Sequence, residues 1–160
     1  MTGDVRGRDV VVLGLGQTGL SLVRWLTSHG ARVRVWDSRE TAPQDAALAE
    51  ALPQAQRLRG ELTDEAFAGI RLILKSPGLA PTDARIAGPL ARAAETGVLV
   101  QGELELFARA LADLKEAQGY APKLIAITGT NGKTTTAAMT ALLGERAGRR
   151  VAMAGNIGPT

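Results

Sequence analysis

The sequence predicts an α/β fold built on a parallel sheet. Short apolar runs alternate with segments of helical periodicity along most of the 160 residues. A glycine-rich loop follows two of these runs, as happens where a parallel strand leads into a helix. Aromatic residues make up only 3% of the chain, so its core must rest on alanine, leucine, valine and isoleucine. Together these observations favour buried strands covered by alanine- and leucine-rich helices.

The strands and helices predicted in the first part of the chain follow one another in strict alternation. Apolar runs predict strands at 9–13, 70–74 and 98–100, and residues 32–36 are predicted as a further strand. Helical spacing, an entering proline or a following glycine predicts helices at 17–29, 43–52, 83–96 and 102–118. This order predicts parallel strands joined by helical crossovers.

A second predicted domain begins near Gln101. We expect residues 1–101 to form one domain and residues 102–160 the incomplete beginning of another. After the break at 119–122, the pattern predicts a strand at 123–127, a helix at 134–147 and a strand at 150–154. About 60 residues are too few to close an α/β sheet on their own.

Composition argues against several classes of function. The net charge is only +3 and no long basic run occurs, so nucleic-acid binding is not favoured. The absence of cysteine excludes disulfides and thiolate catalysis. No apolar run reaches the roughly 18 residues of a membrane span, and the N-terminus lacks the apolar segment of a signal peptide. We therefore expect a cytoplasmic protein, without nucleic-acid or membrane partners, that is a monomer.

The segment from Ile127 to Thr135, I-T-G-T-N-G-K-T-T, has the features of a phosphate-binding loop. It lies between a predicted strand and a predicted helix, where backbone N–H groups and the helix dipole favour an anion. Lys133 would reach the β- and γ-phosphates, and the Thr134 hydroxyl would bind Mg²⁺. The spacing is shorter than in the general G-x-x-x-x-G-K-[ST] pattern. The alternative is a glycine turn whose lysine is merely solvated.

A second glycine loop, Gly14-Leu-Gly16-Gln-Thr-Gly19, follows the first predicted strand and opens a helix. It matches G-x-G-x-x-G, and Asp37 ends the next strand, as in dinucleotide-binding domains. One interpretation is therefore an NAD-binding module of an oxidoreductase, and another is a tight turn without a ligand. A dehydrogenase needs no second phosphate loop, so the two loops together are harder to explain in that way.

Two further motifs follow predicted strands. Asp37-Ser38-Arg39 ends the second strand and Ser76-Pro77-Gly78 ends the third long apolar run. Carboxyl ends of parallel strands meet at one edge of a sheet, so these motifs and the first glycine loop can converge on one ligand. A helix cap at Asp37 and an ordinary turn at Ser76 are the alternatives. The scattered acidic residues provide no recognisable acid–base pair.

With these motifs in view, the chain resembles the Mur ligases, the ATP-dependent family that builds the peptide stem of peptidoglycan. The resemblance covers about residues 7–158 and includes Gly102-Glu-Leu-Glu-Leu-Phe107 and Gly155-Asn-Ile-Gly158 beside the four motifs above. It points to the branch that adds D-glutamate to UDP-N-acetylmuramoyl-L-alanine. It implies a Rossmann-like domain for the UDP-sugar, followed by the start of a P-loop ATP-binding central domain.

The resemblance assigns roles to individual residues. The residues implied for the UDP-sugar are Gly14, Gly16, Gln17, Thr18, Gly19, Asp37, Ser38, Arg39, Ser76, Gly78 and Asn156. Those implied for ATP are Gly129, Thr130, Asn131, Gly132, Lys133, Thr134 and Thr135, with Lys133 catalytic and Thr134 on Mg²⁺.

The resemblance also implies the reaction. ATP would convert the alanyl carboxylate to an acyl phosphate, which the amine of D-glutamate then attacks. Further metal ligands and the D-glutamate site belong to parts of the family absent from these 160 residues. We therefore expect the isolated chain not to be catalytically competent.

Overall fold

The computed structural model describes residues 5–155 and divides into two compact units, Met1–Tyr120 and Ala121–Thr160. We call them the N-terminal unit and the C-terminal unit. The N-terminal unit contains the strands β1 (Asp9–Leu13), β2 (Arg32–Trp36), β3 (Gln56–Leu58), β4 (Leu72–Lys75) and β5 (Leu99–Gln101). Its helices are α1 (Gln17–Ser28), α2 (Asp45–Ala51), α3 (Ala87–Glu95) and α4 (Glu103–Gln118), with a 3-10 turn η1 (Asp64–Phe67). The helix described in the C-terminal unit is α5 (Lys133–Arg146).

The five strands form one parallel sheet in the order β3-β2-β1-β4-β5. The central strand is β1, whose last residue, Leu13, lies opposite Trp36 of β2 on one side and Lys75 of β4 on the other. The chain builds outward from β1 through β2 to β3 and then returns to the other side of β1. This reversal of the strand order falls at the carboxyl ends of β1 and β4, the usual ligand position in open α/β sheets. The predicted α/β, Rossmann-like fold is confirmed.

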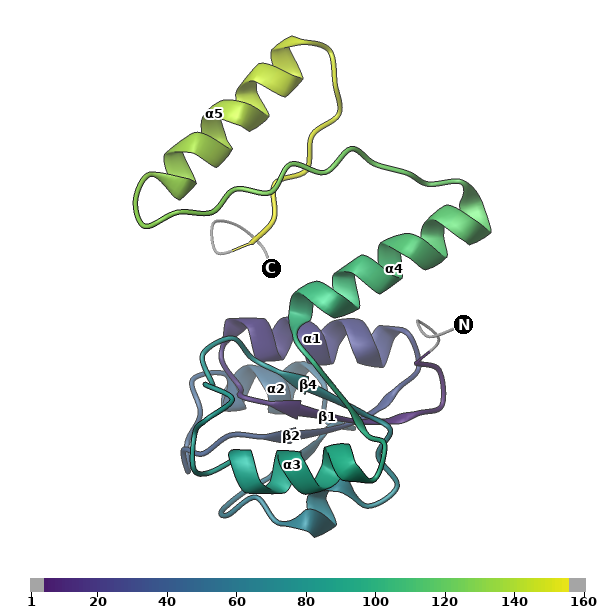
Figure 1. Ribbon diagram of the computed structural model, residues 1–160, viewed down its shortest axis with the longest axis vertical. Helices are drawn as coiled ribbons and strands as arrows, with labels where there is room; N and C mark the ends of the chain where they lie inside the picture. The colour runs from purple at the N-terminus through teal and green to yellow at the C-terminus, as the bar shows by residue number, and fades with distance from the viewer. Residues whose placement is uncertain (1–4, 156–160) are drawn as a thin grey trace. The chain divides into compact units, whose positions relative to one another are not determined.

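Hydrophobic side chains form one core on each face of the sheet. Val10 and Val12 of β1 face a core that includes residues of α1, α2 and α4, while Val11 and Leu13 face a core that includes η1 and α3. Figure 1 shows α1 and α3 on opposite faces of the sheet. Because β1 is buried on both faces, its sequence is continuously apolar rather than alternating.

Some boundaries in the N-terminal unit differ from the predicted ones. Strand β3 and turn η1 were not predicted, because Gln56–Leu58 is a short, largely polar edge strand without an apolar signal. Helix α3 begins at Ala87 rather than at residue 83, since the Asp83 carbonyl first closes a turn by accepting from Ile86 N and Ala87 N. The rest of the predicted strands and helices in this unit are present with small shifts at their ends.

The prediction of strands at 123–127 and 150–154 is wrong. Neither segment has strand structure, and α5 contains no buried residue. Strand-forming side chains such as Ile125 and Val151 remain exposed. A parallel strand requires a hydrogen-bonded neighbouring strand, and none is present among the described residues of this unit. The sequence pattern indicates that these segments favour strand structure, which forms only when a neighbouring strand pairs with them.

Within residues 5–155, no helix is long and apolar enough to cross a membrane.

Candidate functional site

Three loops meet at the carboxyl edge of the sheet in the N-terminal unit. Beyond the end of β1, Gly14 N donates to Trp36 O over 2.7 Å. Beyond the end of β4, Ser76 N donates to Leu13 O over 2.9 Å. These bonds extend the ladders past the last paired residues, so the loops after β1, β2 and β4 are fixed relative to one another. The structure thus brings together the three motifs that the sequence places at this edge.

The three glycines of the first loop have different structural roles. Gly14 has a φ of +95°, and a Cβ there would lie 2.9 Å from the Ser76 Cβ. A Cβ on Gly19 would lie 1.9 Å from Gly14 O, so any side chain there would force the loop to shift. Gly16 is the N-cap of α1, and a Cβ on it would meet no atom within 4 Å. Gly14 and Gly19 therefore allow the tight turn and the close approach of α1, while Gly16 leaves room for a ligand.

The N-terminus of α1 is available to an anion. No side chain caps it, and the first backbone hydrogen bond of the helix runs from Leu20 N to Gly16 O. Among the described residues, the N–H groups of Gln17 and Thr18 have no acceptor. Unpaired N–H groups and the helix dipole together favour a negatively charged group such as a phosphate.

Asp37 is a buried carboxylate, 3% exposed, that joins two of the loops. Its Oδ2 accepts from Leu15 N at 2.7 Å and from Arg39 Nη2 at 2.8 Å. Its Oδ1 accepts from Arg39 N at 2.9 Å and from Arg39 Nε at 2.8 Å. The Arg39 side chain, followed by the two backbone N–H groups, holds the pKa of Asp37 well below its usual range despite burial. With four donors in place, the carboxylate orders the loops and has little capacity left to accept from a ligand.

Ser38 and Arg39 are exposed beside this buried carboxylate. The Arg39 carbonyl accepts from Arg57 Nη2 of β3 at 3.2 Å, which supports the loop from the neighbouring strand. On the other side, Arg85 Nη1 donates to Ser38 Oγ over 2.8 Å.

Arg85 lies between β4 and α3, and sequence reasoning missed it. Its backbone N and its Nε both donate to Asp83 Oδ1, and its Nη2 donates to Asp83 Oδ2. This hydrogen bonding lowers the pKa of Asp83 to about 2. Asp83-Ala-Arg85 thus repeats the arrangement of Asp37-Ser-Arg39, and this shared D-x-R spacing is the sequence signal that could have found it.

Ser76-Pro-Gly78 forms the third side of the site. The Lys75 ammonium donates to Ser76 O at 3.2 Å and to Leu79 O, which ties the two ends of this turn together. A Cβ on Gly78 would meet no atom within 4 Å, so the turn borders open space. Asn156, the remaining residue predicted for the UDP-sugar, lies outside the described residues.

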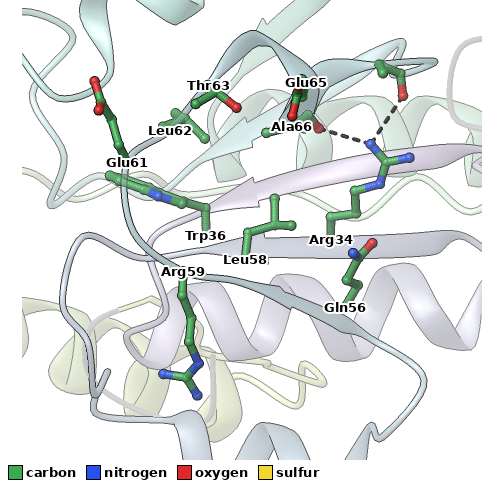
Figure 2. Close-up of a pocket in the computed structure, with 11 residues that line it drawn as sticks. Arg34, Trp36, Gln56, Leu58, Arg59, Glu61, Leu62, Thr63, Glu65 and Ala66 are labelled. Atoms are coloured by element: carbon green, nitrogen blue, oxygen red, sulfur yellow. Dashed lines mark hydrogen bonds between the residues drawn. The ribbon is translucent and has the colours of Figure 1, made fainter.

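A separate depression of about 410 Å³ lies beside β2 and β3, where the chain runs from Arg59 to Ala68. Figure 2 shows Trp36, Leu58 and Arg34 among its lining residues, with Arg34 Nη1 donating to the carbonyls of Ala66 and Ala68. The Trp36 indole Nε1 donates to Gly60 O over 3.0 Å. None of the residues predicted for a ligand lines this depression. We place the candidate site at the three converging loops, because the unpaired N–H groups and the glycine geometry lie there.

The second glycine loop lies in the C-terminal unit and precedes α5. Gly129 and Gly132 have φ values of +146° and +72°, which favour glycine. Lys133 Nζ donates to Gly129 O and, over 3.4 Å, to Thr130 O. Gly132 is the N-cap of α5, which no side chain caps, and Thr136 N donates to Gly132 O. The curled loop, the uncapped helix and the nearby ammonium fit a phosphate, although the predicted strand before the loop is missing.

Comparison with known proteins agrees with the motifs. The model of the family "Mur ligase MurD-like, N-terminal domain" matches residues 8–102. A Ralstonia nicotianae protein named UDP-N-acetylmuramoylalanine--D-glutamate ligase is 51% identical over 160 residues, 100% of this chain and 32% of the relative. A Burkholderia mallei protein of the same name is 52% identical over 160 residues, 99% of this chain and 32% of the relative. This chain therefore spans about a third of the length of the curated relatives it matches.

Among solved structures, the shikimate dehydrogenase of Aquifex aeolicus is similar with a TM-score of 0.50 and 17% identity. The likeness covers 76% of this chain and 53% of that one. At this identity it shows a shared fold and nothing about the reaction. The family match spans more than half of the chain and includes the first glycine loop, Asp37-Ser-Arg39 and Ser76-Pro-Gly78. The chain therefore belongs to the Mur ligase family, in which residues 8–102 form a MurD-like N-terminal domain.

Proposed function

We propose that this chain is the N-terminal part of an ATP-dependent ligase that adds D-glutamate to UDP-N-acetylmuramoyl-L-alanine. The observation that carries the proposal is 51% identity, along the whole chain, to a relative named for that activity. The loop geometry supports it, since the unpaired N–H groups at the start of α1 and the open side of Gly16 favour a phosphate at the edge where the three loops meet.

The N-terminal unit would bind the UDP end of the substrate. The diphosphate would lie at the N-terminus of α1, against the N–H groups of Gln17 and Thr18 and the open side of Gly16. Ser76 and Gly78 would border it from the β4 side. Ser38 and Arg39 would face the nucleoside, because the loop after the second strand lies on the nucleoside side in dinucleotide-binding sheets. Asp37 would position this loop rather than contact the ligand, since its oxygens already accept four hydrogen bonds.

The loop from Gly129 to Thr135 would bind ATP. Lys133 would exchange its bonds to the loop carbonyls for bonds to phosphate oxygens, and Thr134 would supply a hydroxyl ligand to Mg²⁺. ATP, when bound, supplies the phosphoryl group that activates the alanyl carboxylate. The fixed positive charge of Lys133 would stabilise the negative charge that develops during that transfer.

A chimera tests this function directly. Residues 1–160 replace the matched N-terminal third of the Ralstonia relative, and phosphate release is measured. We expect release only when UDP-N-acetylmuramoyl-L-alanine, ATP and D-glutamate are all present. Lys133→Ala should lower the rate by about 100-fold or more, the cost of removing one preorganised electrostatic stabiliser. Lys123→Ala, which removes a lysine outside the loop, is the control.

Two results would contradict the proposal: a folded chimera that releases no phosphate, or release that does not depend on D-glutamate. The isolated chain should bind UDP-N-acetylmuramoyl-L-alanine in calorimetry without turning it over. The same preparation distinguishes the NAD-binding alternative, because that alternative requires NADH fluorescence to rise on titration, whereas we expect it to stay flat.

A further inference from the structure

Arg85 connects two loops of the candidate site, although it is not among the residues that the sequence motifs predict for a ligand. It follows β4, yet its Nη1 donates over 2.8 Å to the hydroxyl of Ser38, which follows β2 and lies 47 residues earlier in the chain. The side chain is 58% exposed, so this contact leaves part of the guanidinium open to solvent or to a ligand.

Asp83 holds Arg85 in this position. The Asp83 carboxylate accepts from Arg85 N over 3.0 Å, from Nε over 2.8 Å and also from Nη2. We call this pair of Asp83 and Arg85 a fork. The Asp83 side chain is only 17% exposed, so the acidic end of the fork is largely buried while its basic end is open. A planar guanidinium held in this way has a fixed direction for its remaining donors.

The exposed groups at this point are hydrogen-bond donors. Three of the five N–H bonds of Arg85 have acceptors on Asp83 and Ser38, which leaves two without an acceptor among the described residues. Because Ser38 Oγ accepts from Arg85, its own hydrogen points away from the guanidinium. The nearby Asp37 carboxylate is occupied by Leu15 and Arg39. The pair of Ser38 and Arg85 therefore favours an acceptor oxygen on the ligand.

We propose that Arg85, together with Ser38, selects the base of the nucleotide by donating to the O4 carbonyl oxygen of uracil. This inference rests on the proposed function, which supplies a uridine nucleotide. The base is the part of the ligand concerned, because the phosphates belong at the N-terminus of α1 and the loop after β2 lies on the nucleoside side. Cytosine carries an amino group where uracil carries its O4 carbonyl oxygen. The amino group of cytosine would face the N–H groups of Arg85, one donor against another, so Arg85 would disfavour cytosine.

Calorimetric titration of the 160-residue chain with UDP and with CDP tests the inference. We expect the wild type to bind UDP at least about 10-fold more tightly than CDP, the scale of a hydrogen bond to a charged group. Arg85→Ala should weaken UDP binding by about 10-fold and leave CDP binding nearly unchanged, so the preference is lost. Arg92→Ala is the matched control, since Arg92 of α3 is equally exposed and also pairs with an aspartate, Asp64.

Ser38→Ala gives a second, smaller change that keeps the Asp83–Arg85 fork. It should reduce the preference for UDP in the same direction, and it serves alone if Arg85→Ala does not fold. An unchanged UDP/CDP ratio in the folded variants, or a wild type that binds both equally, would overturn this inference and leave the proposed function standing. A wild type that binds no uridine nucleotide, in the chimera as well as in the isolated chain, would overturn both.

Discussion

Asp37 lies at the candidate site, but the hydrogen bonds of its carboxylate go to the protein itself. Its carboxylate is 3% exposed and accepts from Leu15 N in the first glycine loop and from Arg39 in its own loop. The residue therefore acts through the loop positions that it fixes. Removing one partner of such a buried pair leaves the other donors without an acceptor, which is more costly than losing one surface contact.

The pH dependence of stability tests this role. The pKa of folded Asp37 lies below that of the unfolded chain, so the unfolded state binds more protons in acid. The contribution of Asp37 is complete above the unfolded pKa of about 3.9 and is lost as the pH falls toward the folded value. Asp37→Asn should lower the free energy of unfolding at pH 7 by about 1–3 kcal/mol. The substitution should also make the free energy of unfolding fall less steeply between about pH 5 and pH 3. Urea denaturation at each pH measures both effects.

Asp64→Asn provides the control for that measurement. Asp64 also pairs with an arginine, but its side chain is 60% exposed, and such pairs contribute little. Its substitution should leave the unfolding curve nearly unchanged at every pH. If the free energy of unfolding falls with pH equally steeply in the wild type and in Asp37→Asn, the buried carboxylate is not the group that titrates.

At the residue scale, the sequence identified what lies in motifs and missed what does not. Gly14, Gly19 and Asp37 follow strands at a known spacing, so their convergence at one edge follows from parallel topology. Arg85 shares the D-x-R spacing with Arg39, but that spacing does not predict its contact with Ser38, which depends on how the segment after β4 folds back. A contact between residues 47 positions apart is a property of the tertiary structure.

Helix α1 and its glycine loop form one packed element. Gly19 allows the first turn of α1 to lie directly on Gly14 O, whereas Gly16 at the N-cap faces open space. Two glycines of one motif thus differ in their surroundings: Gly19 is packed against the loop, and Gly16 borders open space. Stability and binding should respond differently to alanine at these two positions.

Gly19→Ala should destabilise the N-terminal unit, because the new Cβ would lie 1.9 Å from Gly14 O and the loop must move. Overpacking of this kind costs about 1–3 kcal/mol. Gly16→Ala adds a Cβ into open space and should change the free energy of unfolding by no more than about 0.5 kcal/mol. Urea unfolding compares them. A Gly19→Ala protein as stable as the wild type would contradict the packing role.

The accuracy of the predicted elements follows their burial. Strands β1 and β2 have their predicted ends. Strand β1 is an almost unbroken apolar run, typical of a strand covered on both faces, whereas β2 alternates arginine and valine before Trp36. Strand β3 escaped prediction because a three-residue edge strand needs few apolar side chains. The segments 123–127 and 150–154 have the composition of strands, but among the described residues they have no strand neighbour, and composition alone cannot provide one.

At the scale of the whole chain, the two units differ in how much they bury. The N-terminal unit contains both hydrophobic cores, while α5 in the C-terminal unit buries no side chain. The family match ends at residue 102, whereas the compact unit continues to Tyr120 and includes α4. Leu106 of α4 belongs to the core on the α1 face and is 6% exposed. The domain boundary near Gln101 stays a prediction that this helix makes testable.

Two truncated chains test that boundary. A chain of residues 1–120 should unfold with a free energy within about 0.5 kcal/mol of the full chain, because no core side chain is removed. A chain of residues 1–102 loses the buried Leu106 and should be less stable by about 1.5–3 kcal/mol. Urea denaturation measures both. Equal stability of the two truncated chains would place the end of the folding unit near residue 101, as the sequence predicts.

The two D-x-R forks also affect the thermodynamics of recognition. Arg39 and Arg85 are each held by an aspartate two residues earlier, through bonds made within the folded chain. A long side chain that becomes immobile on binding usually costs about 0.5–1.5 kcal/mol of conformational entropy. Here folding of the loops has already imposed that order. A nucleotide that reaches these arginines therefore meets a rigid, preorganised surface, and the entropic penalty of its capture is correspondingly small.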